Sequence, residues 1–174
     1  MKKQTQWPVR AFILMIGLVC LIALDKIFAP AGNTLADREK ILNKALSAGS
    51  GWTISREKEL DGFVISAAVS QEGKACLAVF EPTEKGGYTL STSASQDKDK
   101  VLVTGAKILE NWYDLIWFQG AETEYAEVRY TIAGLEQPPV RYDTSDMEIL
   151  CIENPAKEYT LQAVYFDANG RAYE

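Results

Sequence analysis

Carboxylates are the most numerous side chains of this sequence that could perform acid–base or metal chemistry. Several stand close together in three groups: Glu57, Glu59 and Asp61; Glu122, Glu124 and Glu127; and Asp143, Asp146 and Glu148. Paired carboxylates can hydrolyse a glycosidic bond or hold a hard cation. In the middle group, however, Glu124 and Glu127 are an odd number of positions apart, which places them on opposite faces of a strand. The pattern therefore indicates a solvated acidic surface.

Histidine is absent from the chain. Its absence removes the commonest general base and the commonest metal ligand together. The sequence also has no Gly-rich phosphate loop and no G-x-S-x-G motif. Asp167-Ala168-Asn169-Gly170 lacks the further acidic ligands of a Ca²⁺ loop and predicts a hairpin turn. We therefore predict no catalytic residue, no cofactor and no metal, with a carboxylate-based hydrolase of unknown substrate as the alternative.

The three cysteines lie in different settings. Cys20 is inside an apolar run and is expected to be buried and inert. Cys76 and Cys151 both fall in expected strands, and outside the cytoplasm two such cysteines can form a disulfide. The alternative is a pair of buried free thiols that act as small apolar residues. The sequence does not place their Cα atoms, so both alternatives stay open.

Residues 110–120, ENWYDLIWFQG, hold two of the four tryptophans. In a strand, their side chains alternate between two faces. We assign one face, with Tyr113, Leu115 and Trp117, to the core. A hairpin with the alternating segment 125–132 would pair these three with Tyr130, Val128 and Ala126, and would bring Asp114 opposite Arg129.

The opposite face of the same stretch is unusually apolar for a protein surface. It comprises Trp112, Ile116 and Phe118, joined across the expected hairpin by Tyr125. Either another sheet or the helix expected at 34–48 covers this face, or the face stays exposed and docks a partner. The second alternative makes Trp112, Ile116, Phe118 and Tyr125 the candidate partner-binding face.

The N-terminus has the features of an anchoring or targeting segment. A basic tail, 1–10, precedes an apolar run that reaches residue 29 and is interrupted only by Asp25 and Lys26. Such a run can cross a bilayer when charged flanks reach the interfaces. We expect 11–29 to be a single transmembrane anchor, with the N-terminus in the cytoplasm and the rest of the chain outside it. Ala29-Pro30-Ala31 also fits a signal-cleavage site, so a secreted protein is the alternative.

Residues 30–51 are expected to form a short amphipathic helix and a linker. Thr34 can cap the helix, because Asp37 stands three residues later in the position of the capping-box acid. Gly49 is a good stop for the helix, and the small residues around it predict a joint.

Residues 52–174 are expected to form a β-rich domain, because the hydrophobic period changes to two from Trp52 onward. Glu72-Gly73 predicts a tight turn, and a two-residue turn there pairs Val69 with Cys76. Short strands with Gly-bearing turns are typical of an antiparallel sandwich or a strongly curved sheet. The fold class is therefore mainly β (α+β), with the charged stretch 96–100 as the best internal boundary.

The charge of the chain limits its partners. The formal net charge is −6, but residues 27–174 hold 14 basic and 23 acidic residues, a charge of −9. An acidic domain disfavours binding to nucleic acid, since phosphate contacts need a basic face. No stretch matches a family signature. The expected function is that of a membrane-anchored extracytoplasmic domain for binding, sensing or assembly, with an envelope protein as the partner.

Overall fold

The computed structural model describes Met15 and residues 31–46, 51–97, 101–118, 123–144 and 148–173. Helix α2 (Leu35–Ala45) precedes a first sheet, with strand order β1-β2-β3-β4. The bounds of its strands are Thr53–Leu60 (β1), Phe63–Val69 (β2), Lys74–Pro82 (β3) and Tyr88–Asp97 (β4).

Two further sheets follow. The middle sheet has the order β10-β6-β5, and its strands are β5 (Val101–Ile108), β6 (Asn111–Phe118) and β10 (Ile149–Glu153). The outer sheet has the order β12-β11-β7-β8, with β9 also paired to β7. Its strands are β7 (Tyr125–Ile132), β8 (Leu135–Glu136), β9 (Val140–Asp143), β11 (Tyr159–Phe166) and β12 (Ala172–Tyr173). All pairs are antiparallel, so the mainly β prediction is confirmed.

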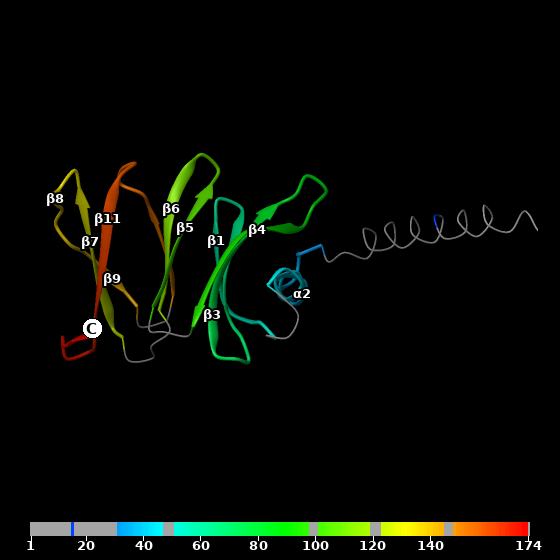
Figure 1. The fold of residues 1–174 in the computed structure, drawn as a ribbon, viewed down its shortest axis with the longest axis horizontal. Coiled ribbons are helices and arrows are strands. Elements are labelled where there is room, and N and C mark those ends of the chain that lie inside the picture. Colours follow the sequence, from blue (N-terminus) through cyan, green and yellow to red (C-terminus); the bar gives the residue numbers. More distant parts are fainter. Residues whose placement is uncertain are drawn as a thin grey trace, which may run out of the picture.

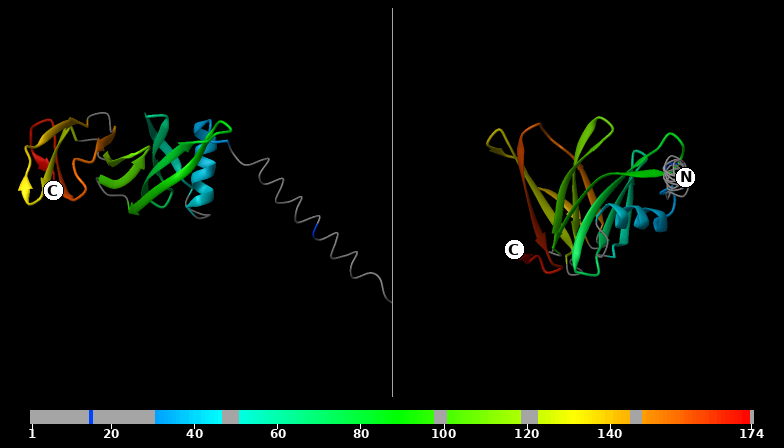
Figure 2. Two further views of the ribbon diagram at one scale, coloured as in Figure 1. Left: turned by 90° about the horizontal axis from the view of Figure 1, so that it is seen from above. Right: turned by 45° about the vertical axis from the view of Figure 1, so that its right-hand side comes forward.

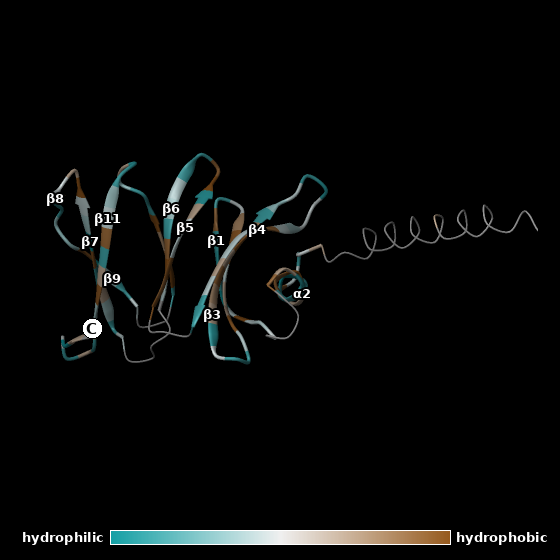
Figure 3. Ribbon diagram, viewed as in Figure 1, coloured by the Kyte–Doolittle hydropathy of each residue, from teal (hydrophilic) through white to brown (hydrophobic). Residues whose placement is uncertain are grey.

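The helix and the three sheets are stacked as layers in a row (Figures 1 and 2). Three hydrophobic clusters fill the interfaces: Leu42 and Phe80 lie between α2 and the first sheet, Leu77 and Leu115 between the first and middle sheets, and Ile116 between the middle and outer sheets. Figure 3 shows apolar residues along the middle of β3 and polar residues at the β3–β4 turn. The first and middle sheets thus have a hydrophobic cluster on each of their two faces.

Among the described residues, no helix combines the length and the apolar composition that a bilayer crossing needs. The expected anchor, 11–29, lies outside the described residues except for Met15.

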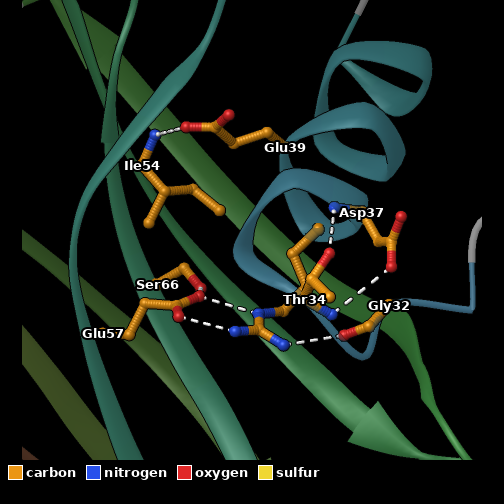
Figure 4. Close-up of polar contacts among 8 residues, drawn as sticks. Gly32, Thr34, Asp37, Glu39, Ile54, Glu57 and Ser66 are labelled. Carbon is orange, nitrogen blue, oxygen red and sulfur yellow. Dashed lines mark hydrogen bonds and ion pairs between the residues drawn. The ribbon is translucent and has the colours of Figure 1, made fainter.

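Helix α2 is fixed to the first sheet by polar contacts (Figure 4). Arg38 donates two hydrogen bonds to the carboxylate of Glu57, at 2.7 and 2.6 Å, and a third to the carbonyl of Gly32 at 2.7 Å. Ser66 also donates to Glu57, at 2.8 Å. Burial opposes ionisation of Glu57, but the bonds from Arg38 and Ser66 outweigh it and hold the pKa of Glu57 below its usual value. The helix therefore packs on the domain.

The predicted helix start is also present. Thr34 and Asp37 form the reciprocal hydrogen bonds of a capping box. The described helix ends at Ala45, and the predicted stop at Gly49 lies outside the described residues.

The chain enters the domain through a tight backbone contact. The amide of Tyr88 donates to the carbonyl of Ala31 at 2.6 Å. Gly32 and Gly87 both have positive φ, and a Cβ on Gly87 would lie 2.0 Å from the Ala31 oxygen. Both glycines are required here, because a side chain at either position would collide with the backbone of the opposing segment.

The register of the β2–β3 hairpin differs from the prediction. Val69 pairs with Ala75, and Cys76 pairs with Ala68. The turn has three residues between Ser70 and Lys74, and Gly73 adopts a φ of 80°. A type I turn followed by a left-handed glycine is a standard three-residue hairpin, so the predicted two-residue turn was one residue too short. The shift moves Cys76 to the face that packs under α2.

The predicted hairpin between 110–120 and 125–132 is wrong. Strand β6 pairs with β5 on one edge and with β10 on the other, and β7 belongs to the outer sheet. The turn before β6 is Leu109-Glu110, with Leu109 at a φ of 53°. Asp114 therefore faces the outer sheet and does not pair with Arg129, whose guanidinium contacts Glu127 and Glu136.

Candidate functional site

The candidate site is a part of the middle sheet that the outer sheet leaves uncovered. On β5, alternate residues point into the core beside the first sheet: Leu102, Ala106 and Ile108. The residues between them point the other way and are exposed: Val103, Gly105 and Lys107. On β6, Trp112 lies beside Lys107 and is 55% exposed. We call Val103, Gly105, Lys107 and Trp112 the β5–β6 surface.

Asp114 forms the floor of this surface and is only 8% exposed. The hydroxyl of Tyr130, on β7, donates to one of its oxygens at 3.1 Å, and the hydroxyl of Tyr159, on β11, donates to the other at 2.9 Å. Among the described residues, no lysine or arginine forms an ion pair with Asp114. The carboxylate is thus held by two neutral donors, an unusual setting for a buried acid.

The pKa values of Tyr130 and Tyr159 are raised in this setting. Burial, followed by the hydrogen bond to Asp114, raises the pKa of Tyr159 to about 12. Burial and the charge of Asp114 also raise the pKa of Tyr130 above its usual value. Both hydroxyls therefore stay protonated and continue to donate to Asp114 at neutral pH.

Gly105 leaves open space beside Asp114. The two residues are direct partners across the β5–β6 ladder, so their side-chain positions lie side by side on one face. A Cβ built on Gly105 meets no atom within 4 Å, and Gly105 is not among the glycines with positive φ. The missing side chain leaves a lane across β5, bordered by Val103 and Lys107, that leads to Asp114. We call it the Gly105 lane.

The predicted partner-binding residues do not form one exposed face. Trp112 is exposed, but Ile116 is fully buried because the outer sheet packs on it. Phe118 ends β6 and pairs with Val101, and its side chain lies outside what the structure describes. Tyr125 begins β7, where it stacks on Phe166. The outer sheet thus covers part of the predicted face, which was one of the two expected alternatives, and leaves Trp112 exposed.

Tyr125 has a structural environment of its own. Its ring is parallel to that of Phe166 at a centroid distance of 4.7 Å, and the guanidinium of Arg141 lies 3.5 Å from its centroid. These contacts join β7, β9 and β11 at one end of the outer sheet. Both faces of the ring are therefore engaged within the sheet itself.

Cys76 and Cys151 are free thiols in the structure, and Cys20 lies outside the described residues. Cys76 lies in the cluster under α2, whereas Cys151 packs against the cluster between the first and middle sheets. The first sheet separates them, so the disulfide alternative is not realised. Burial raises the pKa of Cys76 to about 12 and that of Cys151 to about 11, which makes both poor nucleophiles.

The three acidic groups lie only partly within the described residues, because Glu122 and Asp146 fall outside them. Among the described residues, no group of three Asp, Glu or Cys side chains is arranged to hold a metal ion. Asp167 accepts the backbone amides of Asn169 and Arg171, each at 2.8 Å, and these hydrogen bonds lower its pKa. Residues 167–170 therefore form the predicted hairpin turn.

A groove of about 720 Å³ lies between α2 and the β3–β4 turn. Ile41 and Tyr88 supply apolar surface, and Lys44 and Lys85 stand at its sides. It adjoins Ala31, where the chain enters the domain.

The sequence identified Trp112 but missed Gly105 and the role of Asp114. One signal for Gly105 was present, since an isolated glycine inside a strand pattern often marks close approach by another group. No local signal linked Asp114 to Tyr130 and Tyr159, because these residues lie on three strands that are distant in the chain.

The comparisons with known proteins give no relative for this chain. No family model, no curated protein and no solved structure matches it.

Proposed function

We propose that this protein is a membrane-anchored binding domain that holds another protein of the cell envelope. Residues 11–29 anchor it, the basic tail 1–10 stays in the cytoplasm, and the β-rich domain stands outside. The basic flank before the apolar run supports this orientation. The contact surface for the partner is the β5–β6 surface.

The exposure of Trp112 is the observation that carries this proposal. Tryptophan is among the residue types that contribute most to protein interfaces, and here 55% of it is open to solvent. Its strand is paired on both edges, so the ring stands on a rigid support and little conformational entropy is lost on binding. Val103 and Leu109, which are 44% and 62% exposed, add apolar area on β5 and in the turn that follows it.

The entry contact supports a retained anchor over a cleaved signal. Cleavage after Ala31 would remove the carbonyl that accepts the amide of Tyr88 at 2.6 Å. Ala31 thus belongs to the folded domain. Mass spectrometry of the mature protein should therefore find residues upstream of Ala31. A mature chain that begins at Gly32 would contradict the membrane anchor and favour a secreted protein.

The binding function is tested by crosslinking and capture of the full-length protein from membranes. Trp112→Ala should lose the partner that the wild type captures. Leu135→Ala is the matched control, because Leu135 is 70% exposed but lies on β8 of the outer sheet. Both variants should unfold at the wild-type urea concentration, since surface truncations change stability little. A partner that is retained by folded Trp112→Ala contradicts the proposed contact surface.

A further inference from the structure

The free edge of β5 is the first of three observations that point to the chemistry of the partner. Among the described residues, β5 pairs only with β6. Gln96 of β4 donates to the carbonyl of Val101, so the start of β5 is held from the side of the first sheet. From Val103 to Lys107 no strand of the described chain other than β6 pairs with β5. An extended peptide can pair with such an edge through main-chain hydrogen bonds.

The second observation is that the fold does not explain Gly105. Its backbone is not left-handed, and a Cβ would meet open space. Glycine weakens a strand interior, because it costs backbone entropy and offers no side chain to pack. Almost any other residue would therefore make β5 more stable. What glycine provides at this position is the lane to Asp114.

The third observation is charge. Asp114 is buried and has only neutral donors among the described residues. The body of the protein carries a charge of −9 over residues 27–174, which attracts cationic partners and speeds their association. A group entering the Gly105 lane would therefore be favoured if it were positively charged.

We infer that the β5 edge binds an extended segment of a protein partner, and that a lysine or arginine of this segment lies across Gly105 and pairs with Asp114. This inference rests on the proposed binding function and specifies the partner. Neighbouring strands lie about 4.8 Å apart, so the partner strand stands two strand spacings from β6. The long stem of lysine or arginine can cross the single intervening position when that position is glycine.

The neighbouring side chains fit this arrangement. Trp112 precedes Asp114 by two residues on the same face, about 7 Å along the strand, where its ring can contact the stem or charge of the incoming side chain. Lys107 borders the lane, but its ammonium contacts the carboxylate of Glu110 at 3.3 Å, toward the turn. The positive charge nearest the lane is thus partly neutralised and directed away.

The test uses full-length protein in detergent micelles and two nine-residue peptides as probes. Both peptides alternate threonine and valine and are blocked at their ends. One has a central arginine, and the other has citrulline, which has the same shape without the charge. Amide shifts of β5, followed by NMR, report binding. The arginine peptide should bind about tenfold more tightly than the citrulline peptide, because it alone forms a charge-assisted bond with Asp114.

Three variants locate the effect. Asp114→Asn should bind both peptides equally and weakly. Gly105→Val should also lose the preference for arginine, because the valine side chain fills the lane, while its urea midpoint rises. Gly105→Ala should lose part of the preference. Leu135→Ala is the control, because Leu135 is exposed on β8 outside the β5–β6 surface, and it should keep the preference. The combination of a more stable strand with weaker binding is not expected of a residue that only supports the fold.

The outcomes separate this inference from the proposed function. The inference is overturned if neither peptide shifts the β5 amides at millimolar concentration, if the wild type does not distinguish the peptides, or if Gly105→Val keeps the preference. If membrane capture depends on Trp112 while Gly105→Val and Asp114→Asn capture the same partner as the wild type, the binding function stands and only this inference fails. If capture does not depend on Trp112, the proposed function fails whatever the peptides show.

Discussion

Glu57 and Asp114 are two carboxylates withdrawn from solvent in different ways. The Glu57 side chain is 22% exposed, yet it receives two hydrogen bonds from Arg38 and one from Ser66. Asp114 is more deeply buried, at 8% exposed, and receives only two phenol hydroxyls. Glu57, which is more accessible to water, thus has a charged partner within the described chain, whereas Asp114 has only neutral ones.

This difference separates a structural acid from a candidate functional one. The Glu57 pair joins α2 to β1 and is complete within the molecule. Asp114 joins the middle and outer sheets through hydroxyls, but its charge is not balanced by a cation among the described residues. A carboxylate that has its counter-ion within the molecule contributes to the fold. A carboxylate that lacks a counter-ion and lies beside the Gly105 lane is available to bind a cation. Four measurements test this distinction.

The largest effect is expected for Glu57→Gln. The substitution leaves the Arg38 side chain, which is 9% exposed, without a counter-ion. Removing one partner of a buried ion pair costs about 3 kcal/mol of unfolding free energy. Urea unfolding of the full chain in detergent measures it. Glu59→Gln, on the same strand but exposed, should change stability by less than about 0.5 kcal/mol and serves as the control.

Acid should weaken the wild type through the same pair. The folded-state pKa of Glu57 is lowered, so its contribution is full above its unfolded pKa of about 4.3 and is lost as the pH falls through the folded value. The urea midpoint of the wild type should therefore fall more steeply below about pH 4.5 than that of Glu57→Gln. Parallel curves for the two proteins would show that the pair does not link stability to pH.

A smaller effect is expected for Asp114→Asn. Asparagine can accept a hydrogen bond from one tyrosine and donate to the other, and it removes the cost of burying a charge. The unfolding free energy should therefore stay within about 1 kcal/mol of the wild type. A loss as large as that of Glu57→Gln would mean that a cation pairs with Asp114 in the folded protein, and the contrast between the two acids would disappear.

The smallest effect concerns the phenols. Asp114→Asn should lower the pKa of Tyr159 from about 12 but leave it above the usual value of about 10, because burial is the larger cause. In the wild type this raised pKa favours the folded state below pH 10, and that contribution is lost as the pH rises toward 12. NMR titration of the tyrosine ring signals measures both. An unchanged pKa in the variant would show that Asp114 is neutral or distant.

Local sequence predicted the β-rich class and the burial of one side of β6. The alternation in residues 110–120 correctly placed Tyr113, Leu115 and Trp117 in the core, because a period of two is a local property of a strand. The neighbours of β6 were missed. The β5–β6 turn is Leu109-Glu110, which has none of the glycine, asparagine or aspartate residues that reveal a hairpin.

The candidate site was predicted only in part, for a related reason. Trp112 was identified because its type and face are evident from the strand itself. Asp114 was expected to contact Arg129, but its hydroxyl partners come from the outer sheet. β10 also pairs with β6 from more than thirty residues away in the chain. Pairings of this range depend on how the layers stack, and no short window of sequence contains that information.

The entry contact has a mechanical consequence. A pull on the chain ahead of Ala31 reaches β4 through the amide of Tyr88, and reaches β1 through Arg38 and Glu57. These strands are the two opposite edges of the first sheet. Tension is therefore shared across the full width of the sheet and does not peel one edge strand away. Both edges of the first sheet are therefore loaded together when the chain is pulled from its N-terminal side.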